Sequence, residues 1–273
     1  MSENAAHILQ TDKATIKFGG LTAVNELTMD VGRGEIYGLI GPNGAGKTTI
    51  FNLLTGVYEP TSGDIRIVGT RVNGLKPYQI SRLGVSRTFQ NIRLFPSMSV
   101  LENVVTACHR HSKQNIIDAV FRLPRYFKDE KVHNDFAMEL LEIFGLAKYK
   151  DEGGTSLPYG NQRRLEIVRA LATRPQLLLL DEPAAGMNAG ETTALISAVR
   201  QASADYKCGV VVIDHDLRFI MTLCNRIFVL DAGRIIASGP PHVVTKDPKV
   251  IEVYIGPTKK NAMQHVQEET AHD

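Results

Sequence analysis

The sequence predicts an α/β fold built on a largely parallel β-sheet that is covered by helices on both faces. Short apolar runs, such as residues 177–180 and 209–213, alternate with helical patterns in the C-terminal third of the chain, as they do in parallel sheets buried on both faces. Nearer the N-terminus, a glycine-rich loop at 41–46 joins an apolar strand to a helix. We therefore expect a single domain over residues 14–256.

The composition is that of an ordinary globular protein. The 273 residues are 43% hydrophobic and 22% charged with a net charge of +2, which gives no global case for a nucleic-acid partner. The longest apolar runs fall far short of the roughly 20 residues that span a bilayer, and the first residues lack the pattern of a secretory signal. Three widely spaced cysteines form no disulfide framework. We expect a cytoplasmic protein that reaches a membrane only through a partner.

The first elements after an expected N-terminal extension, residues 1–13, have the pattern of strands. Leu27, Met29 and Val31 alternate with polar neighbours, which is the period of a half-buried strand. Residues 61–74 alternate between glycine-containing turns and predict a hairpin or a sheet edge. Between them, residues 35–56 read as strand, glycine-rich loop and helix. These patterns predict an antiparallel β part on the N-terminal side of the core.

Residues 91–160 have helical character and predict a helical lobe inserted in the core. Helical spacing at 134–146 ends at Gly145, and Pro124 is expected to break or kink a helix over 115–131. After residue 176 strands and helices alternate, up to a short hairpin arm at 232–241. The tail, residues 257–273, has few apolar side chains and is expected to stay mobile.

The glycine-rich loop fits the pattern G-x-x-x-x-G-K-[ST], in which backbone N–H groups surround phosphate oxygens at the start of a helix. Lys47 can place its charge on the β- and γ-phosphates, and the Thr48 hydroxyl can ligate Mg²⁺. A turn with an incidental lysine is the alternative, but the strand before and the helix after the loop favour nucleotide binding. The predicted phosphate-binding residues are Gly41, Pro42, Asn43, Gly44, Ala45, Gly46, Lys47, Thr48 and Thr49.

Two carboxylates follow directly on the apolar run at 177–180. A buried charge is costly unless it meets a metal ion, a partner or a hydrogen-bond network. Asp181 is placed as a phosphate-loop ATPase needs to hold Mg²⁺ opposite Thr48, and Glu182 is suited to act as the general base for the attacking water. The end of a helix is the alternative, but acids are disfavoured at that end of the helix dipole.

With these motifs in order, residues 14–256 resemble the ATPase subunits of ATP-binding cassette (ABC) transporters. The resemblance implies a phosphate-loop (RecA-like) core with an N-terminal antiparallel β subdomain and the inserted helical lobe. It also implies Mg-dependent hydrolysis of ATP, with roles for five further residues. Phe18 would stack on adenine, Gln90 would sense Mg²⁺ and the γ-phosphate, and His215 would contact the γ-phosphate. Gly160 and Asn161 belong to the signature, "LPYGN" from residue 157, which contacts the ATP of the opposite subunit.

Two positions depart from the family pattern. The usual signature is LSGGQ, and Pro158 replaces the serine whose hydroxyl bonds the γ-phosphate. Losing a hydrogen bond worth about 1.5–3 kcal/mol is expected to weaken the ATP-driven closure of two ATPase subunits on each other by about ten- to a hundredfold. Asn188 stands where many relatives have an aspartate between the two ATP sites, which bears on communication between those sites.

Within the family, the chain is most similar to the ATPase subunits of branched-chain (hydrophobic) amino acid importers. The similarity lies in "GVSRTFQNIRLFPSMSVLENV", "YGNQRRLEIVRALATRP", "DEPAAGMN" and "VYIG". Since an ATPase subunit does not touch the cargo, lipopolysaccharide export and urea import remain alternatives, and a soluble ABC ATPase is a third.

The resemblance also implies a partner set. One phosphate loop and one signature act on the same ATP only when different subunits contribute them, so two ATPase subunits should face head to tail. Integral-membrane permeases and, indirectly, a substrate-binding protein complete the expected complex, at the cytoplasmic face of the cell membrane.

Two weaker patterns have simple interpretations. Cys108, His109 and His111 could suggest metal ligands, but residues two apart on a helix face different directions and no fourth ligand is near in sequence, so we expect a solvated helix end. The basic and apolar residues 120–128 could touch lipid headgroups, and packing on a protein partner is the simpler expectation.

Overall fold

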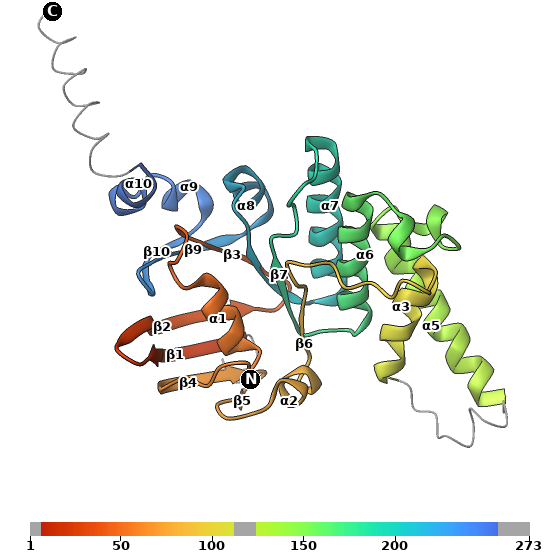
Figure 1. Ribbon diagram of the computed structural model, residues 1–273, viewed down its shortest axis with the longest axis horizontal. Helices are drawn as coiled ribbons and strands as arrows, with labels where there is room; N and C mark the ends of the chain where they lie inside the picture. Colours follow the sequence, from red (N-terminus) through yellow and green to blue (C-terminus); the bar gives the residue numbers. More distant parts are fainter. Residues whose placement is uncertain (1–6, 112–123, 256–273) are drawn as a thin grey trace, which may run out of the picture.

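The computed structural model describes residues 7–111 and 124–255 (Figure 1). The predicted α/β fold is confirmed, with two sheets and a group of helices at one end. The central sheet has six strands in the order β10-β9-β3-β8-β7-β6. Its strands are β3 (Ile36–Ile40), β6 (Val85–Arg87), β7 (Leu177–Asp181), β8 (Gly209–Ile213), β9 (Arg226–Asp231) and β10 (Arg234–Gly239). All neighbours are parallel except the β9–β10 pair, the predicted hairpin arm at the sheet edge.

The second sheet is the predicted antiparallel part, in the order β2-β1-β4-β5. Its strands are β1 (His7–Phe18), β2 (Leu21–Gly32), β4 (Ser62–Ile67) and β5 (Thr70–Arg71). Strand β1 begins at His7, so residues 7–13 belong to the sheet and lie before the expected domain start at residue 14. Two of the four register shifts between β1 and β2, those between His7 and Leu9 and between Thr11 and Ala14, break the alternation that the start of β1 would otherwise show.

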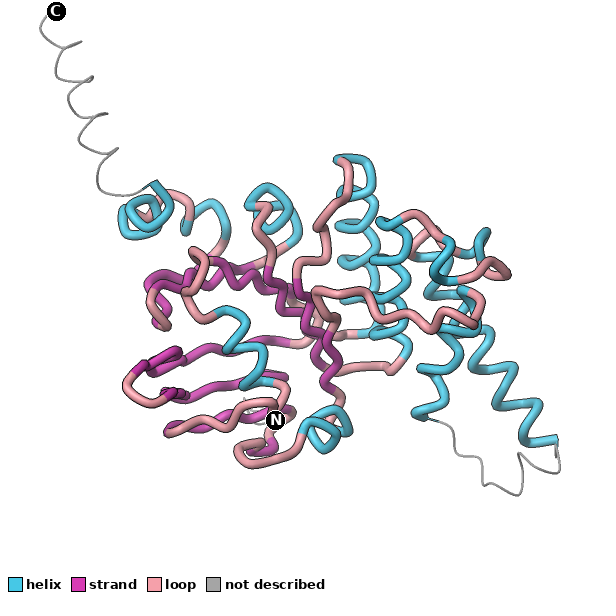
Figure 2. The backbone as a smooth tube through the Cα atoms, in the orientation of Figure 1, coloured by secondary structure: helices cyan, strands magenta, loops and turns pink. Residues whose placement is uncertain are grey.

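The helices fall into two groups, seen in cyan in Figure 2. Near the sheets lie α1 (Lys47–Leu54), α2 (Pro77–Arg82), α8 (Leu217–Leu223), α9 (Pro241–Val244) and α10 (Pro248–Ile255). At one end of the molecule lie α3 (Val100–Cys108), α5 (Pro124–Ile143), α6 (Tyr159–Ala172) and α7 (Ala189–Tyr206). Short 3-10 turns η2 (His109–His111), η3 (Ala147–Tyr149) and η4 (Gly154–Ser156) join this second group.

The helical lobe predicted at 91–160 corresponds to α3, α5 and the start of α6, which contact one another. The predicted boundary at residue 160 falls in the first turn of α6. The helix extends beyond this turn and packs against β6 and β7. Helix α5 begins at Pro124, as expected for a residue that fits the first turn of a helix. Residues 112–123, like the termini 1–6 and 256–273, lie outside the described residues, and with them the expected mobile tail.

Two apolar cores lie on the two faces of the central sheet. Leu178 and Leu180 of β7 pack with the helical lobe and with α7 and α8, while Leu177 and Leu179 pack with α1 and the antiparallel sheet. A strand with both faces buried needs apolar side chains at every position, which explains the four consecutive leucines. Within the ranges 7–111 and 124–255, we find no helix with the length and apolar character to cross a lipid bilayer.

Candidate nucleotide-binding site

The residues predicted from the motifs gather around a cavity of about 550 Å³ at the carboxyl ends of neighbouring strands. The loops that follow β3, β6, β7 and β8 all reach it, which is where open parallel sheets bind ligands. The predicted residues that line the cavity are Asn43, Gly44, Gly46, Lys47, Thr48, Thr49, Gln90, Asp181, Glu182 and His215.

The glycine loop turns between β3 and α1 in a conformation that its glycines require. Gly41 and Gly46 have φ values of 155° and 104°. A Cβ atom on Gly41 would lie 2.1 Å from the Leu230 carbonyl oxygen, and one on Gly46 would lie 2.6 Å from the Ala23 carbonyl oxygen. Helix α1 begins with Gly46 as its N-cap and has no side-chain cap. Its first N–H groups and the helix dipole therefore suit an anion.

Lys47 lies within this loop with only 8% of its surface exposed. Its Nζ donates to the carbonyl oxygens of Gly41 and Pro42, at 2.7 and 2.8 Å. Burial lowers the pKa of Lys47, and the charge of Glu182 opposes that shift. A buried ammonium held only by neutral carbonyls gains from an anion, so the loop fits a phosphate group.

Glu182 receives two contacts from the loops that follow strands β6 and β8. Its Oε1 lies 2.8 Å from Nε2 of His215, and its Oε2 accepts from Nε2 of Gln90 at 3.3 Å. The residue has a φ of 50°, an uncommon conformation for a non-glycine residue and one that often occurs at functional sites. Residues from the ends of β6, β7 and β8 thus meet at one carboxylate, as the motif order predicts.

Asp181 is buried at the end of β7, with 7% of its surface exposed. Its Oδ2 accepts from Nη2 of Arg87 at 2.9 Å, and its N–H donates to the Thr88 hydroxyl at 3.1 Å. Together with the exposed Thr48 hydroxyl and the Gln90 amide at the same cavity, its carboxylate forms a set of oxygen ligands. Such a set fits Mg²⁺, which prefers oxygen and keeps several waters.

Sequence reasoning missed three charged residues that support the site. Arg87 pairs with Asp181 and also donates to Asn52 at 2.7 Å. Asp214, whose pKa is raised by burial, accepts from the N–H groups of Ala184 and Asp216, at 3.1 and 2.9 Å. It therefore holds the loop after Glu182 against the loop that carries His215. The only sequence signal for Asp214 is its place at the end of an apolar run.

The third missed residue, Arg163, connects helix α6 to the loop of Gln90. Arg163 is 2% exposed and donates to the carbonyl oxygens of Phe89 and Gln90, at 2.7 and 2.6 Å. It also pairs with Glu166 at 3.1 Å, and Glu166 accepts from the Phe89 N–H at 3.3 Å. Since α6 begins within the signature, hydrogen bonds from one buried ion pair on α6 join the signature helix to the Gln90 loop.

The cavity lining, as far as residues 7–111 and 124–255 go, does not include Phe18, Gly160 or Asn161. Phe18 ends β1, is 44% exposed and makes an edge contact with Tyr58, with 5.1 Å between the ring centres. Gly160 and Asn161 lie in the first turn of α6. Within the loop, Gly41, Pro42 and Ala45 shape the backbone but do not line the cavity.

The two residues that depart from the family pattern have clear local positions. Pro158 precedes α6, and its carbonyl oxygen accepts from the N–H groups of Asn161 and Gln162, at 2.9 and 3.0 Å. Asn188 is the N-cap of α7: its Oδ1 accepts from the Glu191 N–H, and Glu191 accepts from the Asn188 N–H, both at 3.0 Å. Asn188 therefore forms a capping box, which stabilises a helix start.

Sequence comparison identifies related proteins over nearly the whole chain. The profile of the family described as "ABC transporter" matches residues 24–185, and that of "Branched-chain amino acid ATP-binding cassette transporter" matches residues 234–256. BraF, a high-affinity branched-chain amino acid transport ATP-binding protein of Pseudomonas aeruginosa, is 41% identical over 91% of this chain and 98% of its own length. LivG of Escherichia coli, with the same description, is 40% identical over the same shares.

Solved structures show the same fold. The ADP conformation of MJ1267, an ATP-binding cassette of an ABC transporter, superposes with a TM-score of 0.77 at 29% sequence identity. The match covers 92% of this chain and 99% of that protein. A nucleotide-free ATP-binding cassette from an ABC transporter gives the same values.

Proposed function

Because the chain belongs to the ABC transporter family and is a transport ATPase, we propose that it energises the import of branched-chain or other hydrophobic amino acids. The branched-chain amino acid transport function of relatives such as BraF and LivG, together with their coverage of nearly the whole chain, supports this cargo class. The gathering of Lys47, Asp181 and Glu182 around one cavity is the observation that carries the ATPase assignment.

In the proposed mechanism ATP binds in this cavity with its phosphates on the loop from Gly41 to Gly46. The Lys47 ammonium breaks its two hydrogen bonds to backbone carbonyl oxygens and forms an ion pair with the β- and γ-phosphates. The N–H groups at the start of α1 supply further donors. Phe18, the exposed aromatic at the end of β1, stacks on the adenine ring.

Thr48, Gln90 and Asp181 are the proposed Mg²⁺ ligands, directly or through water. An Mg²⁺ ion held by these residues would supply positive charge to the phosphate oxygens. Glu182 takes the proton from the attacking water, and its contacts with His215 and Gln90 orient the carboxylate for that step. His215, with 56% of its side chain exposed, is free to turn toward the γ-phosphate.

The signature residues Gly160 and Asn161 lie in the first turn of α6 and do not line the cavity, which supports a site completed by a second ATPase subunit. In the proposed unit two subunits face head to tail and close on ATP, and hydrolysis reopens them. The Gln90 loop and the helical lobe pass this motion to permease subunits in the membrane, and the complex lies on the cytoplasmic face. A substrate-binding protein delivers the cargo from the other side.

The variant Glu182→Gln tests the ATPase mechanism. Removing a general base lowers the turnover number by about 10²- to 10⁴-fold, whereas ATP binding should persist because the loop and Lys47 are unchanged. We expect the variant to accumulate as a closed dimer with ATP, measured by phosphate release and by size-exclusion chromatography. Glu252→Gln, in α10, is the matched control. Normal turnover of Glu182→Gln would overturn the assignment of the base.

Isolation of the complex from its own cells tests the cargo. The tagged protein should co-purify from gently solubilised membranes with polytopic permeases, a second ATPase and an amino-acid-binding protein. Reconstituted vesicles holding this complex should take up leucine when ATP is supplied. Recovery of ribosomes, or of no membrane protein, would contradict the proposed transport function but would not affect the ATPase assignment.

A further inference from the structure

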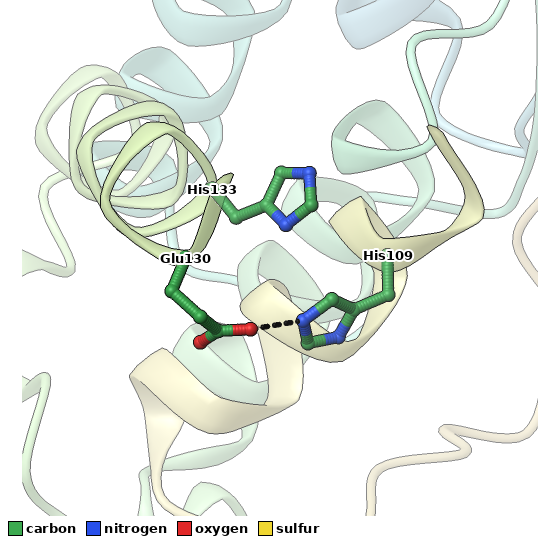
Figure 3. A group of neighbouring side chains, drawn as sticks. All are labelled: His109, Glu130 and His133. Carbon is green, nitrogen blue, oxygen red and sulfur yellow. Dashed lines mark hydrogen bonds and ion pairs between the residues drawn. The ribbon is translucent and has the colours of Figure 1, made fainter. Parts of the chain in front are cut away.

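The end of α3 and the first half of α5 bring together three side chains that the nucleotide site does not use. His109 begins the 3-10 turn after α3, and Glu130 and His133 lie three residues apart on α5 (Figure 3). Residues three apart on a helix share a face. We expected a solvated helix end with no fourth ligand near in sequence, and His109 is indeed 43% exposed at the end of α3. The structure adds a partner from a distant helix, because Glu130 lies 21 positions away in the chain.

The geometry of the cluster is that of a small ligand set. Nε2 of His109 lies 2.8 Å from Oε1 of Glu130, and the two histidine rings meet edge to face with their centres 5.1 Å apart. One potential ligand atom from each residue lies within 4.8 Å of the other two. Tetrahedral Zn²⁺ with bonds of about 2.0–2.1 Å holds its ligand atoms roughly 3.3 Å apart. Small rotations of these side chains are therefore enough to close the set around an ion.

His133 supplies an independent observation. The residue is 6% exposed, and its Nδ1 is buried with no hydrogen-bond partner among the described residues. Figure 3 shows one nitrogen of this ring facing His109 and Glu130. An unpaired buried polar atom costs about 1–3 kcal/mol, so an aimed and unsatisfied nitrogen favours a ligand at this position over simple core packing.

We propose that His109, Glu130 and His133 bind a divalent transition-metal ion, with Zn²⁺ as the best match. Two imidazoles and one carboxylate suit zinc, nickel or cobalt and do not suit Mg²⁺ or Ca²⁺, which prefer oxygen ligands. The side chains of His109 and Glu130 are 43% and 26% exposed, so the ion has a path from solvent. Water fills the fourth position.

The bound ion would link the end of α3 to α5. These helices already share the lobe core through Val104 and Leu140, and the metal adds a bond between the turn that follows α3 and the first half of α5. Because the ligands come from two helices that contact each other only when folded, metal binding is coupled to folding of the lobe.

A Zn²⁺ titration of the tag-free, nucleotide-free full chain tests the proposal. We expect one saturable site per chain by calorimetry, and a higher melting temperature in the presence of zinc. His133→Gln and the more exposed Glu130→Gln and His109→Gln should each weaken binding by at least about tenfold. The last two variants change partly exposed side chains, so binding can be read even if His133→Gln fails to fold.

Two further variants distinguish zinc binding at the proposed site from zinc binding by histidines elsewhere in the chain. His215→Ala removes a histidine of the nucleotide cavity, and His242→Ala removes an exposed histidine in α9. Both should bind zinc like the parent. If His215→Ala loses zinc while Glu130→Gln keeps it, the ion belongs to the nucleotide cavity and the proposal is wrong. Equal binding by all variants, or no saturable binding by the parent, would also overturn it.

Discussion

At the scale of single residues, Arg163 connects parts of the site that are distant in the chain. Its guanidinium donates a hydrogen bond to the carbonyl oxygen of Gln90, a residue 73 positions away in the chain. Burial raises the pKa of Glu166, and the charge of Arg163 opposes that shift. The pair is thus held together in a place where either charge alone would be costly.

Arg163→Met should destabilise the protein by about 3–5 kcal/mol, because Glu166 would remain buried without its partner. The double variant Arg163→Met/Glu166→Gln should recover most of this loss, since the neutral amide costs less to bury. Its ATPase activity should nevertheless stay below that of the parent, because the Phe89 and Gln90 carbonyls remain unbound. Urea unfolding and phosphate release measure the two effects. Full activity of the double variant would mean that Arg163 serves stability alone.

Sequence reasoning identified the residues whose roles depend on a local motif. Lys47 and Thr48 follow the glycines directly, and Asp181 and Glu182 end an apolar run, so their places at the cavity could be predicted. Arg87 and Arg163 could not, because each acts through a contact with a residue more than seventy positions away. Arginine is common on exposed helix faces, so its identity alone does not predict burial.

At the scale of elements, helix α6 begins without a side-chain cap, because Pro158 occupies its N-cap position. The same arrangement occurs at α9, where Pro240 is the N-cap. These two starts differ in function: α6 carries the signature, whereas α9 lies with the C-terminal helices beside β9 and β10.

Pro158→Ser should have two effects. A serine cap stabilises the helix start by about 0.5–2 kcal/mol, and its hydroxyl can bond the γ-phosphate of the ATP held by a partner subunit. That bond, of about 1.5–3 kcal/mol, should tighten ATP-driven dimerisation by about ten- to a hundredfold. Analytical ultracentrifugation against ATP concentration measures it. Pro240→Ser should gain the cap effect without any change in dimerisation, and an equal gain in both variants would contradict the proposed role of the signature.

Most element types could be predicted because their apolar period was clear. The strands of the central sheet other than β6, and helix α7, belong to this group. The start of β1 was missed because register shifts disturb its alternation. The pairing of α3 with α5, which assembles His109 with Glu130, depends on tertiary packing that no local period encodes.

At the scale of the whole molecule, the helical lobe and the sheet share one core. Leu140 of α5 is fully buried in the same cluster as Leu180 of β7, which directly precedes Asp181. A close-packed core transmits displacement rather than absorbing it. The lobe and the nucleotide site should therefore unfold together.

Leu140→Ala should lower the free energy of unfolding by about 2–5 kcal/mol, because it leaves a cavity in this core. The loss should appear as one shifted transition. The chain has no tryptophan, so circular dichroism in urea is the suitable measurement. Val132→Ala changes an exposed position on the same helix, 49% of which is open to solvent, and should have little effect. Two separate transitions in Leu140→Ala would show that the lobe folds independently.

The position of β3 has a bearing on how the protein is made. Its two neighbours in the sheet, β8 and β9, come from the last third of the chain, and the Gly233 N–H donates to the Ala45 carbonyl oxygen of the glycine loop at 2.9 Å. A chain emerging from the ribosome therefore carries its phosphate-binding motif early, but lacks the strands that support it until residue 233 is free. Shorter nascent chains would not retain ATP, so nucleotide binding becomes possible only after residue 233 has left the ribosome.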